Sequence, residues 1–121
     1  MDQRETGRAG ERIAERLLRR CGLIILARNW RAAGGELDLA ALEGETLVFV
    51  EVKTRRKGFA DYPRVSGPQR RRIVNASRAF RRRYGVVERP FRFDLVTVTG
   101  DPTRPRELTW LRHYHRTRGE T

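Results

Sequence analysis

Two short apolar segments, 36–42 and 47–53, lie on either side of the turn-like sequence Glu43-Gly44-Glu45-Thr46. Each segment has the length and the aliphatic content of a β-strand, and a glycine between two such segments is typical of a hairpin turn. A hairpin constrains the fold strongly, because its turn sets the register in which the two strands pair. The sequence therefore predicts a β-hairpin over residues 36–53.

Four polar residues share one face of this hairpin if its turn is symmetric. In that register Asp38 faces Glu51, and Glu36 faces Lys53. A shift of one residue would undo this arrangement, so the prediction depends on the turn. Two carboxylates that face each other repel and weaken strand pairing by about 1 kcal/mol or less. We therefore expect a cation between Asp38 and Glu51.

A divalent metal ion, Mg²⁺ or Mn²⁺, would supply that cation. Mg²⁺ commonly binds one or two carboxylates together with water and phosphate oxygens, and such an ion polarises a phosphodiester and activates a water molecule. Lys53 lies on the same side of its strand as Glu51 and could orient that water or neutralise charge in the transition state. We therefore predict Asp38, Glu51 and Lys53 as catalytic residues.

The alternative is that Asp38 and Glu51 lie on a solvated face with Lys53 as an ordinary salt-bridge partner. Two apolar residues, Leu47 and Phe49, share the face with Glu51. Carboxylates that are set into a partly apolar face usually have a function, which favours the metal site.

Periodicity predicts further elements on both sides of the hairpin. An apolar residue at every third or fourth position indicates helices, and short aliphatic runs bounded by glycine or proline indicate strands. The predicted elements are a helix over about 8–21, a buried strand over 23–27, the two hairpin strands, a helix over about 69–84 and a strand over 91–98.

In the tail, residues 101–121, we expect one more short strand or turn and then disorder. The length of 121 residues fits one α/β domain, 1–121, with a core at about 7–98. The predicted element order is α-β-β-β-α-β.

Glu11 lies on the first predicted helix, at the rim of its apolar stripe. From this position its side chain could approach the sheet and join the metal site. The alternative is a glutamate that only stabilises the start of the helix through the macrodipole.

The chain carries 27 Lys and Arg against 15 Asp and Glu, a formal net charge of +12. This charge favours a polyanionic partner, with nucleic acid as the first candidate. An anionic membrane surface is the second, but no apolar run approaches the roughly 20 residues that cross a bilayer, so we expect no membrane segment.

Arginines are concentrated in the loop after the hairpin and on the outward face of the second predicted helix. We predict nucleic-acid contacts from Arg55, Arg56, Arg71, Arg78 and Arg82. The alternative is a basic face that is merely solvated.

The only cysteine, Cys21, ends the apolar stripe of the first predicted helix. A single thiol cannot form an internal disulfide, and this position predicts a buried thiol in a reducing compartment. We therefore expect a cytoplasmic protein.

Several short motifs together resemble one bacterial family. They are Gly10-Glu11, Gly22, Asn29, Arg31, Gly35-Glu36-Leu37-Asp38-Leu39, Phe49-Val50-Glu51-Val52-Lys53-Thr54-Arg55 and Arg92-Phe93-Asp94. Over about residues 7–98 the chain resembles the YraN family of uncharacterised proteins. That family is placed in the restriction-endonuclease-like superfamily with the PD-(D/E)xK nuclease motif, and it is similar to archaeal Holliday junction resolvases.

The resemblance implies a restriction-endonuclease-like α/β fold in which helices flank a mixed central sheet. It also implies that Glu11, Asp38 and Glu51 form the metal site, with the main-chain carbonyl of Val52 as an additional ligand, and that Lys53 acts in catalysis.

The sequence departs from the family pattern at two places after the hairpin. Asp61-Tyr62-Pro63 stands where a Gly-x-Pro element is usual, and Gln69 stands where a lysine is often found. The metal-site residues are intact, so the departures concern substrate contacts.

The leading hypothesis is a Mg²⁺- or Mn²⁺-dependent endonuclease that cuts DNA, with branched or structured DNA as the substrate class. The alternatives are a non-catalytic nucleic-acid-binding protein with the same fold and a small basic protein that packs on RNA within a larger assembly. Only the first requires Asp38, Glu51 and Lys53 to share a face.

Coordinated cleavage of both strands of a symmetric junction needs two metal centres related by a two-fold axis, so this hypothesis predicts a homodimer, at least on DNA. Candidate surfaces for the contact are Trp110 and Leu111 in the tail and Phe59 and Tyr62 in the loop after the hairpin. Each of these side chains could equally cover its own core.

Overall fold

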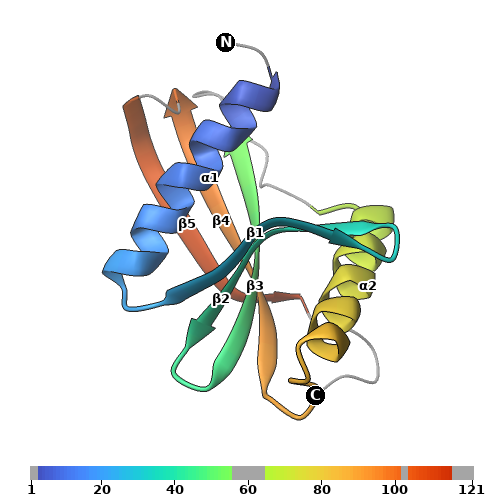
Figure 1. Ribbon diagram of the computed structural model, residues 1–121. Coiled ribbons are helices and arrows are strands. Elements are labelled where there is room, and N and C mark those ends of the chain that lie inside the picture. The colour runs from blue at the N-terminus through green and yellow to red at the C-terminus, as the bar shows by residue number, and fades with distance from the viewer. Residues whose placement is uncertain (1–2, 56–64, 102–103, 116–121) are drawn as a thin grey trace.

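The computed structural model of the protein describes residues 3–55, 65–101 and 104–115. Its elements are α1 (Gln3–Arg20), β1 (Ile24–Ala32), β2 (Gly35–Glu43), β3 (Thr46–Arg55), α2 (Gly67–Arg83), β4 (Phe91–Asp101) and β5 (Arg104–His115). Figure 1 shows a twisted sheet with the two helices packed against it. The predicted order of elements is confirmed and is extended by a fifth strand.

The sheet is mixed, with the strand order β1-β2-β3-β4-β5. β3 and β4 are parallel, and every other neighbouring pair is antiparallel. Parallel neighbours need a crossover connection, and α2 lies within the one between β3 and β4. The structure thus confirms the mixed sheet flanked by helices and is consistent with a nuclease-like fold.

The hairpin of β2 and β3 has the register that a symmetric turn predicts. Leu42 pairs with Leu47, and Leu39 pairs with Val50. Gly44 in the turn has a φ of 59°, which glycine adopts without the steric cost that other residues incur. The matching register ends at the pair Leu39–Val50, so the predicted pairing of Asp38 with Glu51 and of Glu36 with Lys53 lies beyond the backbone ladder.

Alternate residues of β3 belong to two hydrophobic clusters, one on each face of the sheet. Val48 packs in the cluster that contains Leu18 of α1, whereas Phe49 packs in the cluster that contains Phe80 of α2. Burial on both faces explains why this strand reads as an uninterrupted apolar run. Glu51 lies on the same side of β3 as Phe49, which is the side covered by α2.

The predicted strand 23–27 differs from the observed one. We predicted a buried strand, but β1 is an edge strand in which Ile24 and Leu26 are 60% and 44% exposed. A short aliphatic run does not distinguish a central strand from an edge strand. β1 is also longer than predicted, because it continues to a two-residue turn at Ala33 and Gly34, both with positive φ.

The tail contributes more to the sheet than the short strand or turn that we expected. β5 is a strand of 12 residues that pairs antiparallel with β4. The described part of the tail therefore belongs to the sheet. The prediction of a buried Cys21 is wrong, because α1 ends at Arg20 and the thiol lies exposed in the turn that follows.

Candidate active site

The backbone pairing of β2 with β3 stops just before the two predicted carboxylates. The last backbone pair joins Leu39 to Val50. Beyond it, Oδ2 of Asp38 accepts a hydrogen bond from the backbone N–H of Val52, with an N···O distance of 2.8 Å. The side chain of Asp38 also shares a hydrogen bond with that of Glu51. The structure therefore brings Asp38 and Glu51 together where the backbone ladder ends.

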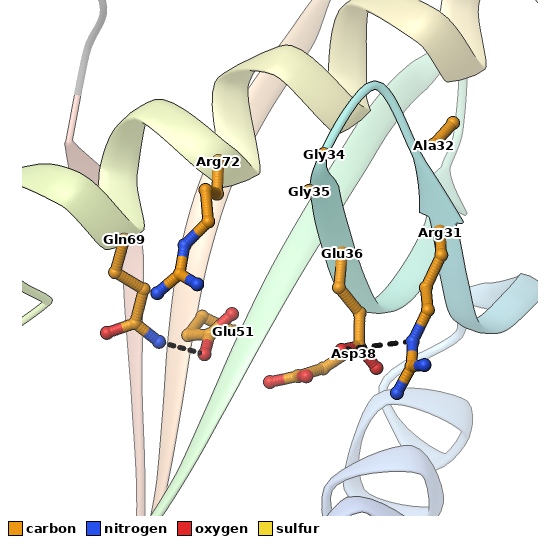
Figure 2. A pocket seen from close by; sticks show the side chains of 9 residues that line it. All are labelled: Arg31, Ala32, Gly34, Gly35, Glu36, Asp38, Glu51, Gln69 and Arg72. Atoms are coloured by element: carbon orange, nitrogen blue, oxygen red, sulfur yellow. Dashed lines mark hydrogen bonds and ion pairs between the residues drawn. The ribbon is translucent and has the colours of Figure 1, made fainter.

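A cavity of about 520 Å³ lies over this point. Three carboxyl groups and two guanidinium groups line it together with small residues of the turn between β1 and β2. The lining residues are Arg31, Ala32, Gly34, Gly35, Glu36, Asp38, Glu51, Gln69 and Arg72. In Figure 2 these residues come from β1, β2, β3, α2 and the turn between β1 and β2.

The first turn of α2 contacts Glu51 directly. Ser66 caps the helix by accepting the backbone N–H of Gln69 at 3.2 Å, and Nε2 of Gln69 donates to Oε1 of Glu51 at 2.8 Å. Figure 2 shows Gln69 and Arg72 pointing from α2 into the cavity on the side of Glu51. The positive end of the helix dipole is thus near Glu51, where it favours negative charge.

Sequence reasoning treated Gln69 only as a departure from the family pattern and missed its contact with Glu51. A signal was present, because Ser66 and Gln69 have the spacing of a capping box. That spacing predicts the start of a helix. It does not predict that the glutamine side chain binds another element instead of the backbone of Ser66.

Close contact between α2 and β2 depends on Gly35. A Cβ atom added there would lie 1.9 Å from the backbone oxygen of Arg72, which is far inside contact distance. Only glycine allows this approach of helix and strand. Gly35 therefore holds α2 at the distance from which Gln69 reaches Glu51.

Burial and mutual repulsion raise the pKa values of the paired carboxyl groups. The pKa of Glu51 rises from an ordinary value of 4.5 to about 8, first because the group is buried and second because of the negative charge of Asp38. Nζ of Lys53 lies 3.5 Å from Oε1 of Glu51, but its attraction lowers the pKa of Glu51 by less than these two effects raise it.

The pKa of Asp38 is also raised by burial, and the Val52 N–H opposes that rise. Both shifts favour a bound proton or cation over two adjacent negative charges at this pair.

Glu11 approaches this pair from the other side of the sheet. Its pKa is raised to about 7, first by burial and then by the charge of Asp38, while a hydrogen bond from the side chain of Asn29 lowers it. α1 comes close to β3 at Gly10, where an added Cβ would lie 2.4 Å from Oγ1 of Thr54. The approach to the sheet expected for Glu11 is observed, and the role of Asn29 was missed by sequence reasoning.

Oxygen donors of the kind that Mg²⁺ prefers are present at this site. Asp38 and Glu51 supply carboxylates, and the carbonyl of Val52 faces β2 because the C=O and N–H of one strand residue point to the same side. Among the residues that the structure describes, no three His, Cys, Asp or Glu side chains are grouped as ligands of one ion. The donors present fit an ion that retains several water ligands, and the ligand role of Glu11 stays a prediction.

The predicted nucleic-acid contacts on α2 face solvent. Arg71, Arg78 and Arg82 are exposed, and Arg55 is half-buried at the end of β3. Arg56 lies outside the described residues. The exposed arginines stay predicted contacts, since exposure alone does not identify a partner.

Two of the four proposed dimer residues pack within their own chain. Trp110 belongs to the cluster under α1 and donates its indole N–H to Oδ2 of the buried Asp94 at 2.9 Å. Leu111 packs on the cluster under α2. Phe59 and Tyr62 lie outside the described residues. Trp110 and Leu111 thus contribute to the core, and the dimer itself stays a prediction.

The motif Arg92-Phe93-Asp94 has a structural role in this chain. Asp94 is buried and accepts hydrogen bonds from Arg92, Trp110 and the backbone N–H of His113. These bonds tie β4 to β5 and satisfy a carboxylate that would otherwise destabilise the core.

In the described part of the chain, none of the helices has the length and apolar character needed to cross a bilayer.

The sequence matches those of bacterial proteins over most of its length. It is 40% identical to a UPF0102 protein of Pseudomonas aeruginosa over 114 residues, which is 91% of each chain. It is 45% identical to a UPF0102 protein of Nitratidesulfovibrio vulgaris over 96 residues, which is 78% of this chain and 72% of the relative. A family model described as uncharacterised protein family UPF0102 matches residues 10–98. The chain therefore belongs to UPF0102, the YraN-like family that its motifs resemble.

Proposed function

We propose that this protein is a Mg²⁺- or Mn²⁺-dependent endonuclease that hydrolyses DNA phosphodiester bonds in branched or structured DNA. The observation that carries the proposal is the partly buried pair of Asp38 and Glu51, which lines the cavity, with Lys53 3.5 Å from Glu51. Titratable groups with strongly shifted pKa values in a cleft are typical of functional sites.

A purely structural role explains this pair poorly. Two adjacent, partly buried carboxyl groups oppose folding, because burial and repulsion both disfavour their charged forms. The buried carboxylate Asp94 differs because its partners are the donors Arg92, Trp110 and the His113 N–H. Asp38 and Glu51 have donors as well, but each also lies beside the other's carboxyl group, and burial and this proximity together raise the pKa of Glu51. Asp38 and Glu51 have the environment expected of a cation-binding site.

In the proposed reaction Asp38, Glu51 and the Val52 carbonyl hold the ion. When bound, the ion supplies Lewis acidity and an activated water molecule. Gln69 fixes one oxygen of Glu51 through its 2.8 Å hydrogen bond. Lys53 has a compact positive charge beside the same carboxyl group, from where it orients the attacking water or neutralises charge that develops on the phosphate.

The surroundings of the cavity support a polyanionic substrate. Arg31 and Arg72 stand among its lining residues, so a phosphate that enters meets positive charge near the carboxyl pair. The exposed arginines of α2 extend this charge along the outer surface. DNA is the proposed substrate and the cytoplasm the proposed location. Coordinated cleavage of a junction would need a second copy of the chain.

A nuclease assay tests the proposal. Linear, flapped and four-way DNA are incubated with Mg²⁺, with Mn²⁺ or with EDTA, using the parent protein and the variants Glu51→Gln and Glu45→Gln. Glu45 is exposed in the hairpin turn, so Glu45→Gln matches the chemical change away from the cavity. We expect metal-dependent cleavage by the parent and by Glu45→Gln only. Cleavage that persists in Glu51→Gln, or no cleavage of any substrate by the parent, contradicts the proposal.

A non-catalytic nucleic-acid-binding protein is the second candidate. The observation that favours it is the exposed arginine face of α2, which needs neither Asp38 nor Glu51. Under this alternative the parent protein binds DNA with equal affinity in EDTA and in Mg²⁺ and never cuts it.

A further inference from the structure

A second cavity, of about 500 Å³, lies between the end of β1 and the C-terminal half of α2. It is lined by Trp30, Arg31, Ala32, Ala79, Arg83 and Tyr84. Arg31 and Ala32 also line the candidate active site, so the two cavities adjoin at the end of β1. A polymer that occupies one of them is therefore positioned to enter the other.

Two aromatic rings form one side of the second cavity. Trp30 is half-buried, packs edge-on against Phe80 with ring centroids 5.3 Å apart, and lies 6.4 Å from the ring of Tyr84. Tyr84 caps the C-terminal end of α2 and is 53% exposed. Packing fixes these rings while leaving part of their surface open to a ligand.

Guanidinium groups supply the charge of this cavity. The Arg31 side chain is 78% exposed and its Nε lies 3.4 Å from Oε2 of Glu36, a residue of the first cavity. The guanidinium carbon of Arg83 lies 5.8 Å from the centre of the Tyr84 ring. None of the six lining residues is acidic. The cavity thus combines flat aromatic surface with positive charge, and it complements a ligand that has a flat ring and a negative charge.

We propose that this aromatic cavity is a stacking subsite for an unpaired nucleobase of the strand whose phosphate enters the active site. Nucleobases stack on aromatic rings and on guanidinium planes with little regard to sequence, and arginines hold the adjoining phosphates. A base in a duplex is already stacked and paired, so only an unpaired nucleotide can occupy the subsite. The inference rests on the proposed nuclease function and specifies its substrate as DNA with single-stranded nucleotides next to the cleavage site.

Binding measurements in EDTA test this subsite without cleavage. The probes are a blunt DNA duplex and the same duplex with a short oligothymidine tail on either the 5′ or the 3′ end. We expect the parent protein to bind one tailed duplex about 5- to 150-fold more tightly than the blunt one, which is the contribution of about one stacked base. The variant Tyr84→Ala should lose most of this preference while its affinity for the blunt duplex stays within about twofold.

Charge controls separate stacking from general attraction. Arg83 lines the cavity, whereas Arg16 is exposed on α1, on the other side of the sheet. Arg83→Ala should lower the preference for the tail more than Arg16→Ala does, although both remove one charge. Equal effects of the two variants on the tailed and blunt probes overturn the subsite, because they would indicate attraction by net charge alone.

Tryptophan fluorescence gives a second readout that does not depend on a destabilising truncation. Addition of tailed DNA should quench the fluorescence of Trp30, and Trp30→Phe should abolish this change while keeping a ring against Phe80. Quenching that persists in Trp30→Phe reports on Trp110 and overturns the assignment.

The two proposals fail in different ways. Metal-dependent cleavage together with equal affinity for tailed and blunt DNA overturns the subsite and leaves the nuclease standing. A preference for tails that Tyr84→Ala removes, in a protein that cuts no DNA, supports the subsite and contradicts the nuclease.

Discussion

Oδ2 of Asp38 lies 2.8 Å from the backbone nitrogen of Val52 and takes a hydrogen bond that would otherwise belong to the backbone ladder of the sheet. The last backbone pair of the β2–β3 ladder joins Leu39 to Val50, and the carbonyl of Val52 points to the same side of β3 as its N–H, towards β2. The strand that provides Glu51 and Lys53 thereby also provides a backbone oxygen. The relationship explains how an ordinary hairpin can become a candidate cation site.

Mg²⁺ or Mn²⁺ should stabilise the folded protein. An ion that binds only the folded state adds about 2.7 kcal/mol when its concentration is 100 times its dissociation constant. We expect a rise in Tm of at least about 5 °C at saturating metal, measured by calorimetry at low ionic strength. In Asp38→Asn the rise should vanish. A rise of the same size in that variant would mean that the ion binds elsewhere.

Glu51 should make stability depend on pH. Its pKa is about 8 in the folded protein against an ordinary 4.5, so the folded protein holds the Glu51 proton more tightly than the unfolded chain does. The stability that this proton contributes is fully present below about pH 4.5 and is lost as pH rises towards 8. Glu51→Gln cannot titrate at this position, so its stability does not fall in this way. In EDTA the variant should therefore match the parent near pH 4.5 and exceed it by the order of 1–3 kcal/mol above pH 8, as measured by urea unfolding. A difference that is constant across this range would contradict the shifted pKa.

Lys53 should act on the chemical step more than on binding. Its removal takes away 1 of 27 basic residues, but it also takes away the charge beside Glu51. We expect Lys53→Ala to slow single-turnover cleavage by about 100-fold or more, while the dissociation constant for DNA changes by less than about threefold. Parallel losses of cleavage and of affinity would assign Lys53 to binding only.

The outer face of α2 should determine part of the salt dependence of DNA binding. Each phosphate contact releases counterions, so the logarithm of affinity falls linearly with the logarithm of salt concentration. Changing Arg71, Arg78 and Arg82 together to Ala should reduce the magnitude of that slope by about three. An unchanged slope would show that this face is only solvated and that DNA follows another path.

Gly35 should be intolerant of even one additional carbon. In Gly35→Ala the new Cβ would lie 1.9 Å from the backbone oxygen of Arg72, so α2 must move away from β2. We expect a loss of about 2 kcal/mol or more on urea unfolding. Gly7→Ala is the matched control, since Gly7 is in α1 with no atom within 4 Å of the added carbon, and it should gain about 0.5–1 kcal/mol. Equal effects would contradict the close approach of α2.

Local patterns were sufficient for the hairpin and for the order of the first six elements. The register of Leu42 with Leu47 follows from a turn a few residues long, and the period of apolar residues in α1 and α2 reflects which side of each helix is buried. The family resemblance was likewise carried by contiguous residues. The juxtaposition of Asp38 and Glu51 was predictable because both belong to this one hairpin.

Tertiary structure decided what local periodicity does not encode. β1 became an edge strand and β5 a long partner of β4 because strand order depends on contacts between distant segments, which a short apolar run does not specify. The contact of Gln69 with Glu51 required the crossover that sets α2 against β2 at Gly35. The shifted pKa of Glu51 also has its origin there, because the sequence supplies the carboxyl groups, whereas only the packed fold removes water from around them.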